Sequence, residues 1–367
     1  MKQKITLFLS GDVMTGRGVD QILPHPSNPV LYESYVKDAR DYVKLAEKIN
    51  GCIDRRVAYT YLWGDALKPM KDADMRIINL ETSITYSEAY VDKGINYRMH
   101  PENIPCLTVA QIDCCTLANN HVLDWGHAGL EETIGTLNKV EIRYAGAGLD
   151  SNAANAPCII PVNGKGRVLV FSFGLTSSGI PQDWKATANT PGVNLLDNLS
   201  AATVHQIRDH ISSYKKPHDI VVSSIHWGGN WGYEIPRAQQ EFAHELLDLA
   251  GVDVVHGHSS HHFLDIEIYK QKPIIYGCGD LLNDYEGISG HESYKAQLGF
   301  LYFLTVDVTD GLLISFRMVP TEVKKMQITR PNKSNRRWMQ KILSRECGQF
   351  GTNIRLSDDG TFSLIWN

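Results

Sequence analysis

The sequence predicts a layered α/β fold, in which two β-sheets pack against each other between outer helices. Two patterns predict it. Short apolar runs that end in polar or Gly-rich loops alternate with helix-like runs along most of the chain, which is typical of parallel strands joined by helices. Two hairpin-like segments then follow, and they add antiparallel strands.

The first expected strand is "KITLFLSGD", at residues 4–12, and six later runs have the same character: "MRIINLETSI", "DCCTLANN", "IRYAGAG", "RVLVFSFG", "DIVVSSIHWG" and "VDVVHGHSS". The clearest helices are "GLEETIGTLNKV" and "PRAQQEFAHELLDLAG". The second helix has Pro at its start and Gly251 at its end, as helices commonly do. The hairpins are "FLDIEIYKQKPIIYGCGD" and "GFLYFLTVDVTDGLLISFRMVP", and an Asp-Gly turn joins the strands of the second.

We expect one main domain over residues 1–320. Residues 24–64 interrupt its strand pattern with the Pro-rich "LPHPSNPVLYESYV" and a helix-like run, "KDARDYVKLAEKINGC". This insertion is either a lid, a substrate-selecting segment or a plain surface excursion. Residues 321–367 form a basic C-terminal appendage, in which "RRWMQKILSREC" predicts an amphipathic helix on the surface.

The composition excludes several classes of protein. With 43% hydrophobic and 21% charged residues among 367, the chain fits a soluble globular protein. Scattered Lys and Arg and a net charge of -5 predict no nucleic-acid partner. No run approaches the roughly 20 apolar residues of a spanning helix, so we expect no membrane anchor. Seven cysteines without a C-x-x-C pair predict free thiols and a cytoplasmic protein.

Polar residues follow five of the predicted strands, where turns more often use Gly, Ser or Pro. Because strand ends meet at one edge of a sheet, we expect these side chains to converge. Any one of them could instead be a loop cap or a hydrogen-bonded core histidine, but their recurrence favours a functional site. The set comprises Asp12, Asn79, Glu81, Asn119, Asn120, His121, His226, His256, His258, His261 and His262.

The order of these motifs resembles the CapA family, named for capsular poly-γ-glutamate synthesis. The resemblance covers residues 5–320 and rests on "GDVMTGRG", "NLETSIT", "LANNHVLDWGHAGLEET", "YAGAG" and the block from "HWGGNWGYEIP" to "IIYGCGD". It implies a calcineurin-like metallophosphatase fold, a four-layered α-β-β-α sandwich, with a pocket that such phosphatases use for two metal ions. It also implies a peptide or γ-glutamyl polymer as substrate.

The chain departs from the metallophosphatase pattern at several ligand positions. Met14 stands where the first block has a His, Glu81 replaces a bridging Asp, and Ser259 follows His258 where the family usually has another His. The resemblance then leaves enough ligands for one loosely held divalent ion, either Mn, Zn or Fe, or for none. These ligands are Asp12, Glu81, Asn120, His226, His258 and His261.

Three functions stay open, and the favoured one needs no cofactor. Members of this family are implicated in epimerising a peptide residue, a reaction in which one group removes the Cα proton and another returns it on the opposite face. Asp12 and His291, the latter in "GISGHESY", are the expected pair, although His291 could equally be an exposed loop residue. The groups expected to orient them or stabilise the enolate are His121, His226, Asn120 and Glu81. The alternatives are a metal-dependent hydrolase or phosphoesterase, and a non-catalytic partner in capsule polymer synthesis.

Three further residues are candidates for binding substrate. Arg17 and Arg98 lie in segments next to the same sheet edge, and a guanidinium can bind a carboxylate through two hydrogen bonds. Trp227 could form an aromatic wall of the pocket. For each of the three, a purely structural contact is at least as consistent with the sequence.

Overall fold

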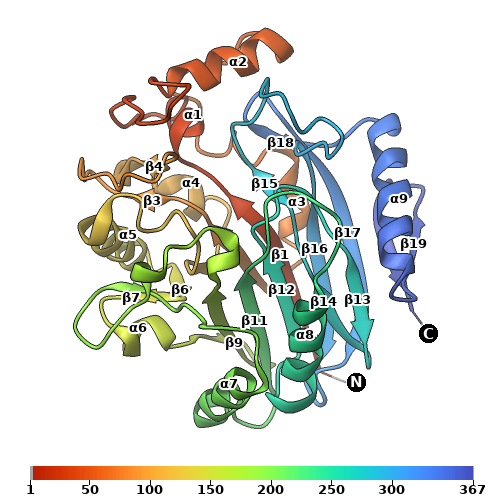
Figure 1. Cartoon of the computed structure of the whole chain (residues 1–367). Coiled ribbons are helices and arrows are strands. Elements are labelled where there is room, and N and C mark those ends of the chain that lie inside the picture. Colours follow the sequence, from red (N-terminus) through yellow and green to blue (C-terminus); the bar gives the residue numbers. More distant parts are fainter. Residues whose placement is uncertain (1–2, 367) are drawn as a thin grey trace.

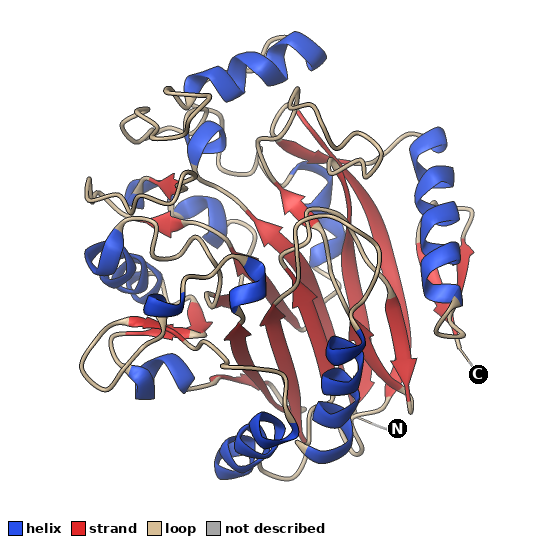
Figure 2. Ribbon diagram, viewed as in Figure 1, coloured by secondary structure: helices blue, strands red, loops and turns tan. Residues whose placement is uncertain are grey.

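The computed structural model describes residues 3–366 of the chain. Two β-sheets are stacked at its centre, and helices cover their outer faces (Figures 1 and 2). The four layers form the α-β-β-α sandwich, so the predicted fold class is confirmed.

Among the described residues, the first sheet has ten strands. Across it the order is β19 (Asn353–Leu356), β20 (Phe362–Ile365), β17 (Leu313–Lys324), β16 (Leu298–Asp307), β1 (Lys4–Val13), β2 (Met75–Leu80), β5 (Cys114–Thr116) and β6 (Arg143–Ala145). Strands β1, β2, β5 and β6 are parallel to their neighbours in this row. On the other side of β1, each strand of the row β16, β17, β20 and β19 is antiparallel to the one before it. Two short strands lie off this path: β15 (Asp280–Leu282) pairs with β1, and β18 (Gln327–Thr329) with β17.

The second sheet has six strands within the described part of the chain. They are β13 (Ile266–Tyr269), β14 (Lys272–Ile275), β12 (Val254–His258), β11 (Asp219–His226), β9 (Gly166–Gly174) and β8 (Cys158–Val162). The inner four strands of this sheet are parallel. The two predicted hairpins are present as antiparallel pairs, β13–β14 in this sheet and β16–β17 in the first. Leu7 and Ile77 of the first sheet share one core with Val170 and Val222 of the second, so the two sheets pack face to face.

The outer helices pack through apolar residues spaced by one turn. In α5 (Gly126–Lys139), Leu130 and Ile134 join the core on the outer face of the first sheet. In α8 (Arg237–Leu249), Phe242 and Leu246 do the same on the second sheet, beside α7 (Ala201–Tyr214). The shorter elements are α1 (Arg17–Asp20), α2 (Arg40–Asn50), α3 (Leu67–Met70), α4 (Pro105–Thr108), α6 (Ser151–Asn155), β3 (Ser83–Ile84) paired with β4 (Arg98–Met99), and β7 (Ala147–Gly148) paired with β10 (Gly192–Val193).

The C-terminal segment is continuous with the first sheet. The boundary expected at residue 320 falls inside β17, and β20 and β19 extend that sheet beyond it. The predicted helix is α9 (Lys333–Gly348), at the edge of the molecule beside β19 (Figure 1). Its residues Met339, Leu343 and Cys347 are buried in the core shared by the two sheets. The segment is therefore part of the folded core as well as of the surface.

The inserted segment, residues 24–64, contributes to the core cluster on the outer side of the first sheet, and its helix α2 lies next to α1 at one end of the molecule (Figure 1). Tyr42, Val43 and Ala46 of α2 are buried there, next to α1. Its role as a lid stays a prediction. All seven cysteines are free thiols, as predicted, and the structure shows that Cys52 alone among them is exposed. Among the helices of the described chain, none combines the length and the apolar character needed to cross a bilayer.

Candidate functional site

Asp12 lies at the centre of the converging strand ends, at the carboxyl end of β1, and is completely buried. Asn79 Nδ2 donates to Asp12 Oδ1 at 2.8 Å, and the Ser259 backbone N–H donates to Oδ2 at 3.3 Å. Ser259 adopts φ 107°, a strained conformation for a residue with a side chain, and such strain often marks functional sites. Burial, reinforced by the charge of Asp280, raises the pKa of Asp12 to about 7.

Glu81 lies beside Asp12 and is also buried. Burial and then the neighbouring charge of Asp12 raise the pKa of Glu81 well above its ordinary value, because two close carboxylates cannot both ionise easily. Apart from a protonated Asp12, Glu81 Oε2 has no hydrogen-bond donor among the described residues. A buried carboxylate pair of this kind needs a proton or a cation to compensate its charge.

Two buried histidines come from neighbouring parallel strands, His226 from β11 and His258 from β12, where they are register partners. Their Nδ1 atoms are 2.8 Å apart, and His258 Nδ1 is 3.9 Å from Asp12 Oδ1. His226 Nε2 is 3.0 Å from Asn120 Oδ1 and 3.8 Å from Glu81 Oε1. Burial, followed by the repulsion of neighbouring histidines, lowers the pKa of both imidazoles, so both are neutral.

A chain of hydrogen bonds behind His258 fixes which of its nitrogens carries the proton. His256 Nε2 is 2.8 Å from the Ser10 carbonyl, which can only accept, so this nitrogen carries the proton. Burial lowers the pKa of His256 to about 4, and its Nδ1 therefore accepts from Ser224 Oγ at 3.1 Å. Ser224 Oγ in turn accepts from His258 Nε2 at 2.8 Å. The Nδ1 lone pair of His258 thereby faces the site, where it accepts from His226 Nδ1 at 2.8 Å.

His261 forms the other side of the site with Asp280, the first residue of β15. His261 Nδ1 is 3.1 Å from Asp280 Oδ1, and Asn283 Nδ2 donates to Asp280 Oδ2 at 2.9 Å. Burial acts to lower the pKa of His261, but the charge of Asp280 and the hydrogen bond to it outweigh burial, and the pKa rises overall. The side chain of His261 is 12% exposed, so this imidazole marks the opening of the site.

His121 borders the site from the loop after β5. Its Nδ1 is 2.7 Å from Asp124 Oδ2, and its Nε2 is 3.9 Å from Glu81 Oε1. Burial lowers the pKa of His121 to about 4, although Asp124 acts in the opposite direction. Lys93 closes this corner with an ion pair to Asp124 at 2.9 Å. His121 is thus a neutral imidazole oriented by a carboxylate.

His291 lies outside this buried cluster. It is exposed, and its ring stacks on Trp231 at a centroid distance of 3.9 Å, while Trp231 in turn contacts His261 at 5.3 Å. Two aromatic rings therefore separate His291 from Asp280 and Asp12. The structure brings six of the predicted catalytic and metal-binding residues around Asp12 and leaves His291 on the rim. The six are Glu81, Asn120, His121, His226, His258 and His261.

The three predicted substrate-binding residues make contacts within the protein. Arg17 is buried between Asp284 and Glu33, with its Nε 2.8 Å from Asp284 and its Nη1 2.8 Å from Glu33. Arg98 donates to the carbonyl groups of Ser87 and Asn28, and its guanidinium lies over the Trp125 ring. Trp227 is buried, and its Nε1–H donates to the Tyr276 carbonyl at 2.9 Å. Their binding of substrate stays a prediction.

Sequence reasoning missed several residues of the site, among them Asp280 and Ser224. Asp280 ends an apolar run as "GCGD", just as Asp12 ends its own as "SGD". Ser224 lies two residues before His226 and therefore on the same face of β11.

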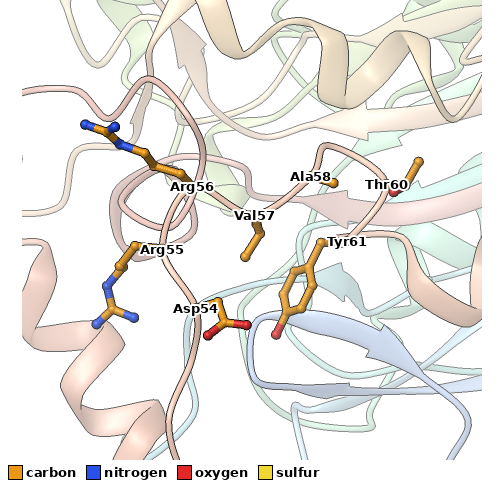
Figure 3. A pocket seen from close by; sticks show the side chains of 7 residues that line it. All are labelled: Asp54, Arg55, Arg56, Val57, Ala58, Thr60 and Tyr61. Atoms are coloured by element: carbon orange, nitrogen blue, oxygen red, sulfur yellow. The ribbon is translucent and has the colours of Figure 1, made fainter.

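A surface hollow lies apart from the site, and residues 54–61 of the inserted segment line it (Figure 3). Its lining includes Arg55, Arg56 and Tyr61 but none of the strand-end residues. Figure 3 shows that the side chains belong to a single loop. We therefore assign the chemistry to the buried strand ends and not to this hollow.

The strand ends fit divalent metal ions. Two groups of three ligand atoms each lie within 4.8 Å of one another: Asp12 with His226 and His258, and Asp12 with His261 and Asp280. Because Asp12 belongs to both groups, it can bridge two ions, as a carboxylate does in two-metal sites. The unsatisfied Glu81 Oε2 and the directed lone pair of His258 add to this fit.

Comparisons with known sequences agree with the motifs. The family described as "Bacterial capsule synthesis protein PGA_cap" matches residues 6–285. A Mycobacterium tuberculosis protein named probable polyglutamine synthesis accessory protein is 43% identical over 98% of this chain and 96% of its own length. The PGA biosynthesis protein CapA of Bacillus subtilis is 32% identical over 56% of this chain and 52% of its own.

Among solved structures, a phosphatase from Mycoplasma pneumoniae is similar over 90% of this chain and 96% of its own, with a TM-score of 0.48 and 15% identity. The match over residues 6–285 and the mycobacterial relative confirm the resemblance drawn from the motifs. The chain belongs to the bacterial capsule synthesis protein family, PGA_cap.

Proposed function

We propose that this protein is a metal-dependent hydrolase that acts on a γ-linked glutamyl polymer or peptide as an accessory of its synthesis. The observation that carries the proposal is the pair of ligand groups that share Asp12. The names of the relatives, which refer to polyglutamine synthesis and to PGA biosynthesis, support the class of substrate. When bound, divalent ions would polarise a substrate carbonyl oxygen and lower the pKa of a water molecule.

The protein's own residues have distinct tasks in this proposal. The ions would be held by Asp12, His226, His258, His261 and Asp280. His121 is neutral and held by Asp124 at 2.7 Å, so its unprotonated Nε2, which faces Glu81, is placed to take a proton from the attacking water and then pass it to the departing amine. Because these side chains are buried, the electrostatic interactions among them are stronger than they would be in water.

The test combines metal content with bond cleavage. Purified protein is stripped with chelator, reloaded with Mn²⁺ or Zn²⁺ and incubated with γ-linked glutamyl oligomers, with p-nitrophenyl phosphate as a second substrate. We expect bound metal and shortened oligomers, and loss of both in Asp12→Asn. Protein that binds no metal, or that binds metal and cleaves only the phosphate ester, would overturn the proposal as stated.

Metal-independent epimerisation is the second candidate, and one observation favours it: the pKa of Asp12, at about 7, suits a general base near neutral pH. Two observations weigh against it. Asp12 is fully buried, and His291 stands two rings away. Deuterium uptake at one Cα of a peptide in heavy water with chelator, lost in Asp12→Asn, would establish this candidate in place of the first.

A further inference from the structure

Asp280 lies directly beside Asp12 in the first sheet. The two residues are register partners of the parallel strands β15 and β1, and the Asp12 N–H donates to the Gly279 carbonyl at 3.3 Å. Both carboxylates are buried. The backbone N–H of Met14 donates to the Leu282 carbonyl at 2.9 Å, so β15 runs alongside the position where the metallophosphatase pattern has an imidazole.

Met14 itself is not suited to be a metal ligand. The Tyr285 hydroxyl donates to its sulfur at 3.5 Å, and a thioether is a poor ligand for hard cations. Asp280, in contrast, is oriented as a ligand. Asn283 holds one of its oxygens at 2.9 Å, and the other is 3.1 Å from His261 Nδ1. Holding one carboxylate oxygen in this way is what outer hydrogen bonds do for metal ligands.

The two ligand groups around Asp12 therefore differ in chemistry. The group with His226 and His258 offers two imidazole nitrogens and one carboxylate. The group with His261 and Asp280 offers two carboxylates and one imidazole. Imidazole suits Zn²⁺, whereas carboxylate oxygen suits Mn²⁺.

We infer that Asp280 replaces, from a different strand, the imidazole missing at position 14, and that it makes the site a mixed one, with Mn²⁺ in the Asp12–His261–Asp280 group and Zn²⁺ in the Asp12–His226–His258 group. This inference rests on the proposed metal-dependent function and specifies which ion each group takes. A carboxylate in place of the imidazole of the metallophosphatase pattern thus changes which metal this ligand group prefers.

The experiment measures binding of each metal separately. Stripped protein is titrated with Mn²⁺, followed by loss of the free-ion electron paramagnetic resonance signal, and with Zn²⁺ by calorimetry. Asp280→Asn keeps the size of the side chain and an oxygen that Asn283 can reach. We expect it to raise the Kd for Mn²⁺ by about 10-fold or more while that for Zn²⁺ changes by less than about 3-fold. His226→Gln should do the reverse, and Asp248→Asn, on the surface, should change neither.

Each outcome has a distinct meaning. If the wild type binds neither metal, the proposed function fails and the inference fails with it. If the wild type binds both metals and Asp280→Asn binds Mn²⁺ as tightly, only the inference is overturned. X-ray absorption spectroscopy of the wild type loaded with both metals reports the ligands of each ion separately. Because it needs no variant, it does not depend on whether a variant folds. It should find two imidazoles around Zn²⁺ and one around Mn²⁺, and equal shells would contradict the assignment.

Discussion

Ser224 Oγ lies 2.8 Å from His258 Nε2, on the side of the imidazole that faces away from Asp12. Because the Ser224 proton is already donated to His256, the serine oxygen accepts from His258. The neutral imidazole is thereby held in the tautomer that presents Nδ1 to the site. One hydroxyl group thus determines whether His258 can act as a ligand.

Replacing Ser224 should weaken metal binding without removing a ligand. In Ser224→Ala the tautomer of His258 is no longer fixed, and loss of such an outer hydrogen bond typically costs 10–100-fold in metal affinity. Calorimetry with Zn²⁺ measures the change. Ser223→Ala is the matched control, since Ser223 is adjacent, equally buried, and has an Oγ without a partner in the described chain. Equal affinities of the two variants would refute the role of Ser224.

Metal affinity should depend on pH with a definite sign. Without metal, Asp12 keeps its proton up to a pKa of about 7, whereas a ligand must be ionised. Binding therefore releases a proton below pH 7, and the affinity should fall as the pH decreases from 8 to 5, by up to about tenfold per unit below the pKa. Calorimetry in buffers of different ionisation enthalpy counts the released protons. A flat profile across this range would mean that Asp12 is ionised before metal binds.

Arg17 should prove structural and not a substrate ligand. Arg17→Met leaves Asp284 and Glu33 as buried charges without their partner, and such a change typically destabilises by about 3–5 kcal/mol. Urea denaturation measures this change. Arg40→Met, which removes an exposed ion pair with Asp38, should cost less than about 1 kcal/mol. A raised KM in an Arg17→Met protein of unchanged stability would instead support the predicted binding of substrate.

The C-terminal segment should stabilise the whole fold. Leu343 in α9 is buried in the core between the sheets, so Leu343→Ala should lower the free energy of unfolding by about 2–5 kcal/mol. Lys341→Ala, on the exposed side of the same helix, is the control and should change it by less than about 0.5 kcal/mol. If the two variants unfold alike, the segment is a separable appendage, as the sequence suggested.

The sequence predicted the strands along the chain and the convergence of their polar ends because both depend on local pattern. Asp12 and His226 each follow an apolar run, and parallel strands bring such ends to one edge. Contacts between distant segments were not readable in this way. Arg17 pairs with Asp284, which lies 267 residues away, and no spacing rule connects them.

Asp280 and α7 were missed for different reasons. β15 has only three residues and follows a predicted hairpin, so its Gly-Asp end resembled part of a turn. α7 has few apolar residues among many polar ones, and only Val204, Ile207 and Ile211 mark its buried stripe, along with Thr203. In both cases the local sequence pattern is a weak signal, and contacts with distant parts of the chain stabilise the element.

The most direct test of the account is a mass spectrum of a γ-linked glutamyl oligomer after incubation with metal-loaded protein in water labelled with both ¹⁸O and deuterium. We predict shorter oligomers in pairs, one fragment with a single ¹⁸O atom in its new carboxylate and the other with a new amine and no ¹⁸O, and the absence of both with chelator or with Asp12→Asn. An oligomer of full length that carries deuterium at Cα, formed equally well with chelator, would contradict it and identify Asp12 as a base and not a metal ligand.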